Sequence, residues 1–514
     1  MKTPRLAYQP SQVIMAPVPA LTAVLFVFMT SSDPHSAAAG LRLVRRLLHS
    51  SRETKTELGR PHRPPGRFHH GVFRSGGSGY LASRKGEDVP TSSNTAKRHE
   101  ECLDRYARLL VEHSLGLREG QPLTVRGEWI HRDLALRVGE AAYSVGAGKV
   151  DYRLVDPLET AQLIRRGRPE QIALHEVERQ TWLNDVLRTR GALLLLDGKS
   201  DPQMMAELRR THPRNHGLLI SESSAIGVEL TRRVIDQRLS PVVTAVCPTP
   251  AWASRVFPEL DGDEAYRRLW ELIFRSTHAL HDDASARAEV QVDRLATRCR
   301  ALDSLDVEEL HVTGGGNDFR VRFTDRTRWR DASARTTSGQ RFFVNVPSFE
   351  VFTTPDRHGT EGRLSASRPL PLHGGALVEG LVLHFRGGRI VDFEAERGAE
   401  DIGSWLDVDD GSRHLGEFAL VAVDSPVGRG GRTFGNTLLD ENAAAHVALG
   451  QAYASALDGG ETMSASELEA VGCNRSTIHV DVAFGSAEVD VVATPRRGGE
   501  TVVLTQGSWA PGFS

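Results

Sequence analysis

The feature that most constrains the fold is a strand, a helix and a second strand in succession, early in the periodic part of the chain. Residues 123–125 form an apolar run typical of a strand, and residues 133–145 carry apolar side chains along one helical side. Glycines end this helix, and residues 150–154 are predicted to form the second strand. Residues 192–196 add an all-apolar strand of the kind buried in parallel sheets. This βαβ succession predicts an α/β domain over residues 98–290.

The pattern changes near Glu309, where helical periodicity fades and short β-rich runs appear. The glycine triplet at residues 314–316 lacks the context of a phosphate-binding loop, so a hairpin turn is favoured over a nucleotide site. One helix is predicted over residues 441–456. The predicted fold class is therefore α/β, with an N-terminal α/β domain containing a parallel sheet and a C-terminal α+β metal-binding domain over residues 291–514.

Residues 1–97 have a different composition. A basic start precedes an apolar stretch at residues 13–29 and small residues at 36–39, which together resemble a secretory signal. The following segment is rich in Arg, His, Gly, Pro and Ser and cannot bury enough surface to offset ordering entropy. We expect residues 1–97 to be a disordered extension. A reading frame extended upstream of the true start is favoured over secretion, so the expected location is cytoplasmic.

Charge and cysteine usage exclude several classes of protein. The formal net charge is −3, which gives no electrostatic reason to expect binding to nucleic acid or to a membrane. The apolar stretch near the N-terminus is interrupted by two prolines and is marginal for a membrane span. The four cysteines are scattered without C-x-x-C spacing, which argues against a disulfide framework and against a structural zinc site.

Four short patches in the C-terminal third each place metal-binding side chains beside a predicted element. Their candidate side chains are Glu350, Glu417, Glu441, His446, His479 and Asp481. His479 and Asp481 stand two apart on a predicted strand, so both side chains project from the same face. Each patch alone also has a structural explanation, since a lone glutamate is usually solvated and an acid in a first helical turn complements the helix dipole. Together, four carboxylates and two imidazoles suit a pair of ions such as Zn, Co or Mn.

The patches resemble the signature of a known family. The blocks N-x-P-x-x-E-V-F-T, G-E-x-A-L-V, N-T-L-x-D-E-N-A-A-x-H-x-A-L-G and H-x-D-x-x-x-G-S occur between residues 345 and 486. In this order they resemble the aminopeptidase T and aminopeptidase S (PepS-type) family of dinuclear metalloaminopeptidases. The resemblance covers approximately residues 98–511. It implies a hydrolase that cuts the N-terminal peptide bond of peptides with a free N-terminus, and it also implies a homodimer.

The resemblance implies a role for each matched residue. The metal ligands would be Glu350, Glu417, His446, His479 and Asp481, with Glu417 bridging two divalent metal ions (Zn, Co, Mn or Mg). Two such ions polarise the scissile carbonyl and lower the pKa of water from about 15.7 towards about 7. Glu441 would be the general base, or alternatively a further ligand. Tyr453, two turns along the predicted helix from His446, would donate a hydrogen bond to the developing oxyanion.

One position departs from the family pattern. The family commonly has paired acids before V-F-T, where this chain has Phe349 followed by Glu350. We identify Glu350 as the ligand. The missing acid motivates the alternative that the chain is a catalytically impaired, peptide-binding member of the same fold. Since every matched ligand position is filled, the active metalloaminopeptidase is the leading prediction.

Overall fold

The computed structural model describes residues 92–199, 201–220, 238–372 and 375–513, and the chain from Asp88 to Ser514 forms one compact unit. The prediction of disorder for residues 1–97 falls outside these described residues except at residues 92–97, where it is wrong because a helix begins at Ser92. Within them, every helix is too short or too polar to cross a membrane. The predicted boundary near residue 290 stays a prediction, because nothing in the contacts of this unit tests it.

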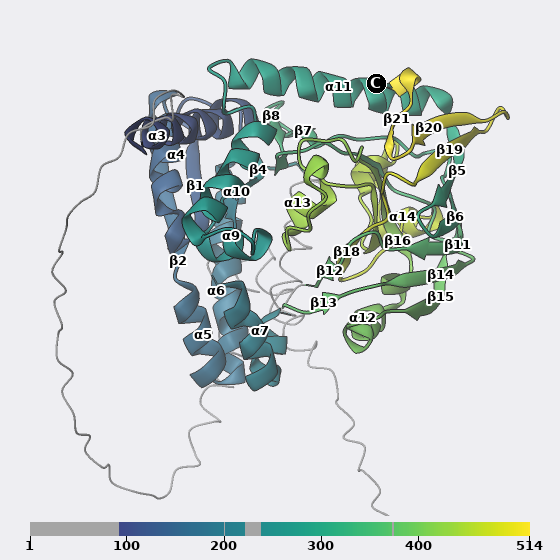
Figure 1. Ribbon diagram of the computed structural model, residues 1–514, viewed down its shortest axis with the longest axis horizontal. Coiled ribbons are helices and arrows are strands. Elements are labelled where there is room, and N and C mark those ends of the chain that lie inside the picture. The colour runs from purple at the N-terminus through teal and green to yellow at the C-terminus, as the bar shows by residue number, and fades with distance from the viewer. Residues whose placement is uncertain (1–91, 200, 221–237, 373–374, 514) are drawn as a thin grey trace, which may run out of the picture. The chain divides into compact units, whose positions relative to one another are not determined.

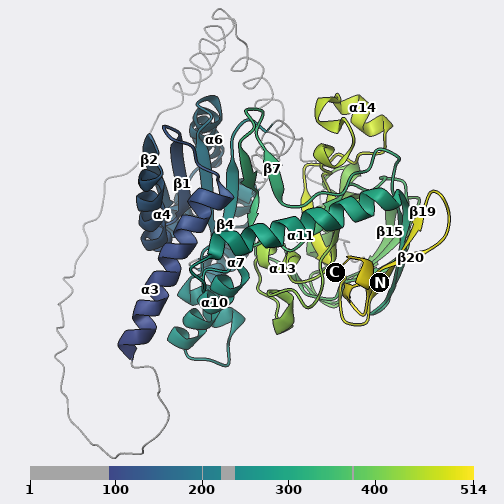
Figure 2. The same cartoon turned by 90° about the horizontal axis from the view of Figure 1, so that it is seen from above.

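A five-stranded parallel sheet forms the α/β part, in the order β2-β1-β3-β4-β9. The predicted βαβ unit is present as β1 (Pro122–Glu128), α4 (Arg132–Ser144) and β2 (Lys149–Val155), followed by β3 (Ala192–Asp197). Figure 2 shows α3 (Ser92–Arg108) alongside α4, next to β1 and β2. Apolar side chains make β3 almost continuously buried, as expected for a central parallel strand.

The last two strands of this sheet come from distant parts of the sequence. β4 (Val242–Val246) pairs with β3, and β9 (Asn345–Val346) pairs with β4 through Thr244 and Asn345. The two-residue strand β9 lies only five residues before Glu350 in the sequence. The chain therefore passes within a few residues from the edge strand of the parallel sheet to Glu350, a predicted metal ligand.

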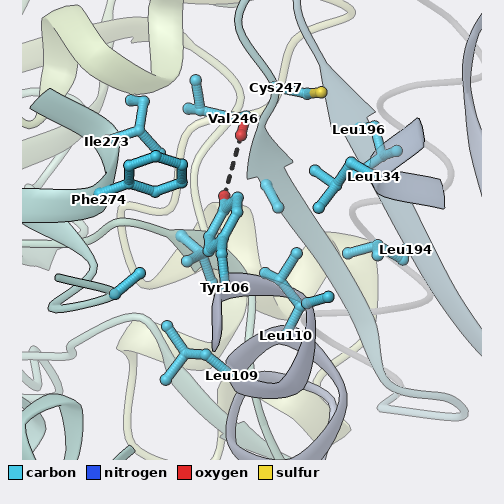
Figure 3. Close-up of a cluster of buried hydrophobic side chains, with 14 of the residues drawn as sticks. Tyr106, Leu109, Leu110, Leu134, Leu194, Leu196, Val246, Cys247, Ile273 and Phe274 are labelled. Carbon is cyan, nitrogen blue, oxygen red and sulfur yellow. Dashed lines mark hydrogen bonds between the residues drawn. The ribbon is translucent and has the colours of Figure 1, made fainter. Parts of the chain in front are cut away.

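The N-terminal helices pack on this sheet through a continuous apolar core. Tyr106 of α3 has no exposed surface, and its hydroxyl donates to the carbonyl of Val246 at 2.9 Å (Figure 3). That bond satisfies the one polar atom of a buried ring and ties the helix to the end of β4. The other helices among the described residues of this part are η1 (Leu109–Ser114), η2 (Trp129–His131), α5 (Pro157–Arg166), α6 (Pro169–Arg188), α7 (Pro202–Thr211), α9 (Pro250–Val256), α10 (Gly262–Ser276) and α11 (Ala284–Leu305).

The C-terminal part is α+β, as predicted, with antiparallel sheets and short helices. Its eight-stranded sheet is ordered along the right-hand side of Figure 1 as β15 (Arg389–Glu394), β14 (Val382–Arg386), β11 (Thr360–Ser365), β6 (Asn317–Arg322), β5 (Val307–Gly314), β19 (Asp490–Pro495), β20 (Thr501–Thr505) and β21 (Ser508–Trp509). The predicted hairpin at residues 314–316 is confirmed, because it joins β5 to β6 with Gly314 opposite Asn317. The smaller elements are β7 (Ser333–Arg335), β8 (Arg341–Phe343), β12 (Leu370–Pro371), β13 (Leu377–Val378), α12 (Ala399–Leu406) and α14 (Ala465–Ala470).

A four-stranded antiparallel sheet carries most of the predicted ligands. Its order is β10 (Val351–Thr353), β16 (Leu415–Leu420), β17 (His446–Gly450) and β18 (His479–Ala483). All residues of β16 and β17 are buried, so these two strands are central to this half of the unit. The sheet thus presents polar ligands from an otherwise apolar interior.

The helix predicted over residues 441–456 is wrong. The helix in this region is α13 (Thr437–Glu441), so Glu441 ends a helix instead of beginning one, and His446 starts strand β17. Residues 443–449 are almost all apolar, and such a run fits a buried strand as well as a buried helix. Pairing with β16 on one side and β18 on the other outweighs the helix propensity of its alanines. Asn436 caps α13 by accepting from the backbone N–H of Leu439.

Candidate metal centre

Three adjacent strands bring four of the five predicted ligands onto one face. Glu417 lies on β16 and pairs with Ala448 of β17, which pairs in turn with Asp481 of β18. His446 stands two residues before Ala448 and His479 two before Asp481, so the strand alternation places all four ligands on the same side. The positions between them on this face are small, namely Ala419, Ala448, Gly450 and Ala483. This pattern leaves room between the ligand side chains.

The ligand atoms form two overlapping triplets. One triplet is Glu350, Glu417 and His446, and the other is Glu417, His479 and Asp481; within each, the ligand atoms lie within 4.8 Å of one another. A carboxylate oxygen of Glu350 is 3.6 Å from Nε2 of His446, and one of Glu417 is 3.2 Å from Nε2 of His479. Glu417 belongs to both triplets, which is the position that a carboxylate shared by two ions would occupy.

Backbone carbonyls orient both imidazoles. Nδ1 of His479 lies 2.8 Å from the carbonyl oxygen of Gln451, and Nδ1 of His446 lies 3.2 Å from that of Ala444. Only a protonated Nδ1 can donate to a carbonyl, so in the neutral rings Nε2 carries the lone pair and faces the carboxylates. This is the arrangement that histidine ligands adopt around metal ions in proteins.

The buried carboxylates shift one another's protonation. Burial raises the pKa of Glu350 to about 8, and the neighbouring Glu417 carboxylate adds to this rise. Burial also raises the pKa of Glu441 well above its ordinary value, with Glu350 and Asp481 contributing. Burial therefore favours the neutral form of both carboxyl groups, whereas bound divalent cations would favour their charged forms.

The pKa values of both imidazoles are also raised, but here the neighbouring carboxylates raise them against the effect of burial. Burial lowers the pKa of His446, but the carboxylates of Glu417 and Glu350 outweigh burial and raise it above its ordinary value. Burial likewise opposes protonation of His479, yet Asp481 and Glu417 raise the pKa of this imidazole well above its ordinary value. The pKa of Asp481 is lowered despite burial because His479 lies beside it. Oxygen and imidazole donors converging in this way fit borderline divalent ions.

Glu441 and Tyr453 also lie at this site, although neither occupies the predicted helix. Oε1 of Glu441 accepts a hydrogen bond from Nδ2 of Asn345 at 3.0 Å. Tyr453 follows β17 in an extended conformation, and its hydroxyl lies 3.2 Å from Nε2 of His479. Its ring packs edge-on against Phe352 of β10. The predicted helical relationship between Tyr453 and His446 is wrong, but the turn after the strand returns the phenol to the ligand face.

Phe349 and Glu350 have different surroundings, as neighbours in an extended segment do. Phe349 is 6% exposed and belongs to the apolar core of the parallel sheet, whereas Glu350 approaches His446. The Phe349 backbone N–H donates to Oδ1 of Asn442 at 2.6 Å. An acid at position 349 would therefore lie among apolar side chains.

Sequence reasoning missed three polar side chains or groups around the ligands. The amides of Asn345 and Asn442 contact Glu441, and the carbonyl of Gln451 contacts His479. Both asparagines lie inside the sequence blocks already noted, but a block alone does not say which side chain each amide meets. Glu441 lies 96 residues after Asn345 in the sequence and directly before Asn442.

A pair of triplets sharing one carboxylate, with two carbonyl-oriented imidazoles, is the arrangement expected of a metal-dependent enzyme. Comparison with known proteins identifies its class. A family model described as "Thermophilic metalloprotease (M29)" matches residues 99–509. Aminopeptidase 2 of Geobacillus stearothermophilus is 33% identical, and aminopeptidase T of Thermus aquaticus is 34% identical; each match covers 80% of this chain and 98% of the relative.

A solved structure supports the same assignment. Wild-type AmpT from Thermus thermophilus superimposes with a TM-score of 0.71 at 31% identity, covering 80% of this chain and 99% of that one. The chain belongs to the M29 metalloprotease family and is a metalloaminopeptidase. The predicted family and fold class are thereby confirmed.

Proposed function

We propose that this metalloaminopeptidase uses two divalent ions to hydrolyse the first peptide bond of peptides with a free N-terminus. The proposed ligands are Glu350, Glu417, His446, His479 and Asp481. The observation that carries the proposal is the membership of Glu417 in both ligand triplets. A single shared carboxylate with separate partners on each side suits two neighbouring ions better than one.

The ions, when bound, would polarise the scissile carbonyl and lower the pKa of the attacking water. Glu441 supplies the base: it would take the proton from that water and deliver it to the leaving amine. Its side chain is half-buried beside the ligands, and its carboxylate is held by Asn345.

Tyr453 is the proposed donor to the oxyanion. Its hydroxyl already lies at hydrogen-bonding distance from the Nε2 atom of His479, at the edge of the ligand cluster. The Thr354 hydroxyl accepts from the backbone N–H of Tyr453, which fixes the start of the turn that carries the phenol. When Nε2 of His479 binds a metal ion instead, the phenol hydroxyl would be free to donate to the carbonyl oxygen as negative charge develops there.

Restriction to the first residue follows from the charge of the site. A free α-amine is a metal ligand when neutral and a partner for a carboxylate when protonated, and both kinds of group are present here. The relatives named above are aminopeptidases, which agrees with peptides as substrates. A homodimer remains a prediction from the resemblance, and a cytoplasmic location and Zn, Co, Mn or Mg as the ions remain predictions from the sequence.

Hydrolysis of leucine and arginine p-nitroanilides by the purified chain tests the proposal. Chelation should abolish turnover, and added Co, Zn, Mn or Mg should restore it. Glu417→Gln should lose at least about 1,000-fold in kcat, because one change disturbs both triplets. Glu488→Gln, which alters an exposed acid, is the matched control and should retain full activity. Peptide binding without metal-restorable turnover would instead support the catalytically impaired alternative.

A further inference from the structure

Glu441 is held by a side chain from the other half of the compact unit. Asn345 lies on β9, the edge strand of the parallel sheet, and pairs with Thr244 of β4. Its Nδ2 donates to Oε1 of Glu441 at 3.0 Å across 96 residues of sequence. Backbone pairing fixes the position of Asn345, so the amide is presented from a rigid strand and not from a loop.

A second amide contacts the same oxygen. Nδ2 of Asn442 lies 3.5 Å from Oε1 of Glu441 and donates to the Leu438 carbonyl at 2.8 Å. The side chain of Asn442 has no exposed surface, and its Oδ1 accepts from the backbone N–H of Phe349. Asn442 thus links the end of α13 to the segment that carries Glu350. Asn345 makes the shorter and better-formed bond to the base.

Among the described residues, both amide contacts to Glu441 end on Oε1, so Oε2 can face a different partner. A carboxylate that takes a proton from water needs one oxygen directed at that water, and a fixed donor on the other oxygen supplies the direction. An aspartate at position 345 would remove the donor and add a like charge next to an already crowded group of acids. Only a neutral donor of about this length fits the observed contact.

We propose that Asn345 is a positioning residue, which holds Oε1 of Glu441 so that Oε2 faces the reacting water. This inference rests on the proposed function, because it assigns Asn345 a task only if Glu441 is the base. The parallel sheet would then take part in the reaction, because its edge strand β9 carries the side chain that orients Glu441, the last residue of α13.

Steady-state kinetics of Asn345→Ala test the proposal. We expect kcat to fall by about 10- to 100-fold, the range typical of lost orienting contacts, while KM and the number of bound metal ions stay unchanged. Asn345→Asp, which preserves shape, should be at least as impaired. The control is Asn317→Ala, which truncates a buried amide that donates to the Gly314 carbonyl, and it should lower thermal stability without changing kcat.

A double-mutant cycle separates positioning from general damage. In a Glu441→Gln background, Asn345→Ala should cause no further loss, because the group it positions no longer accepts a proton. Additive losses, or an unchanged kcat for both Asn345 variants in the wild-type background, would overturn the inference while leaving the proposed function intact. A wild-type chain without metal-restorable turnover would refute the proposed function itself.

Discussion

Glu417 of β16 lies directly opposite Ala448 of β17, whose side chain is a single methyl group. Asp481 of β18 faces the same alanine from the other side, so Ala448 separates two proposed ligands in the middle of the sheet. A larger side chain at this position would project from the ligand face, where the carboxylates converge. The small residues of this face are therefore as much a part of the candidate centre as the ligands.

Ala448→Leu should abolish metal binding. The added carbon atoms would occupy the space between Glu417 and Asp481, and overpacking of a buried site typically costs about 1–3 kcal/mol as well. Metal content after dialysis measures the effect, with Val447→Leu as the control because Val447 points to the opposite face of the same strand. Full metal occupancy in Ala448→Leu would show that the ions lie elsewhere.

Metal binding should release protons at pH 7. Burial raises the pKa of Glu350 to about 8, so the metal-free carboxyl group is mostly protonated at neutral pH. A cation must displace that proton, and apparent affinity should therefore fall as the pH falls. Calorimetric titration in buffers of different ionisation enthalpy counts the protons released. A binding heat independent of the buffer would contradict the shifted pKa of Glu350.

His131 should make the metal-free protein sensitive to acid. Burial, aided by Lys199, lowers the pKa of this imidazole to about 4, and Nδ1 accepts from the backbone N–H of Glu128. Because the folded pKa lies below the unfolded value of about 6.5, the unfolded chain binds the proton first. Stability is then lost between about pH 6.5 and pH 4, by roughly 3 kcal/mol in total.

Urea unfolding of metal-free protein at several pH values measures this loss. His131→Gln should show a flatter dependence on pH in the same window, although it starts from a lower stability at pH 7. Identical slopes for the two proteins would show that the acid sensitivity comes from other groups.

Restoring the family's second acid should be harmful here. Phe349 is buried in the apolar core of the parallel sheet, so Phe349→Glu would place a carboxyl group among apolar side chains and also remove a packed ring. We expect a loss of several kcal/mol in the free energy of unfolding, or no folded protein. Phe349→Leu is the control and should remain folded with its metal content unchanged. A stable Phe349→Glu variant with improved metal affinity would contradict the placement of this side chain.

The sequence predicts those secondary-structure elements whose periodicity and bounding residues lie within one short segment. The βαβ unit was predictable because its helix has a clear periodicity and its strands are bounded by glycines. The strand that begins at His446 was not, because an apolar run with several alanines has no period that separates helix from strand. Strand β9 has only two residues, too few for any periodicity, and its pairing with β4 depends on the tertiary fold.

The candidate site likewise contains features that the sequence predicts and features that it does not. Side chains that bind metals stand out by chemical type, so the six acidic and imidazole groups could be proposed from sequence blocks. The hydrogen bond from Asn345 to Glu441, and that from His479 to the carbonyl of Gln451, join groups whose meeting depends on strand register. Register is set by the packing of the whole sheet, and no short motif encodes it.

The metal content of purified protein, measured by mass spectrometry after reconstitution, tests the central claim most directly. The shared position of Glu417 predicts two tightly bound divalent ions per chain in the wild type. Glu417→Gln should lose tight binding of both ions, whereas Glu488→Gln should keep both. One ion per wild-type chain, or two ions retained in Glu417→Gln, would contradict a centre built around this carboxylate.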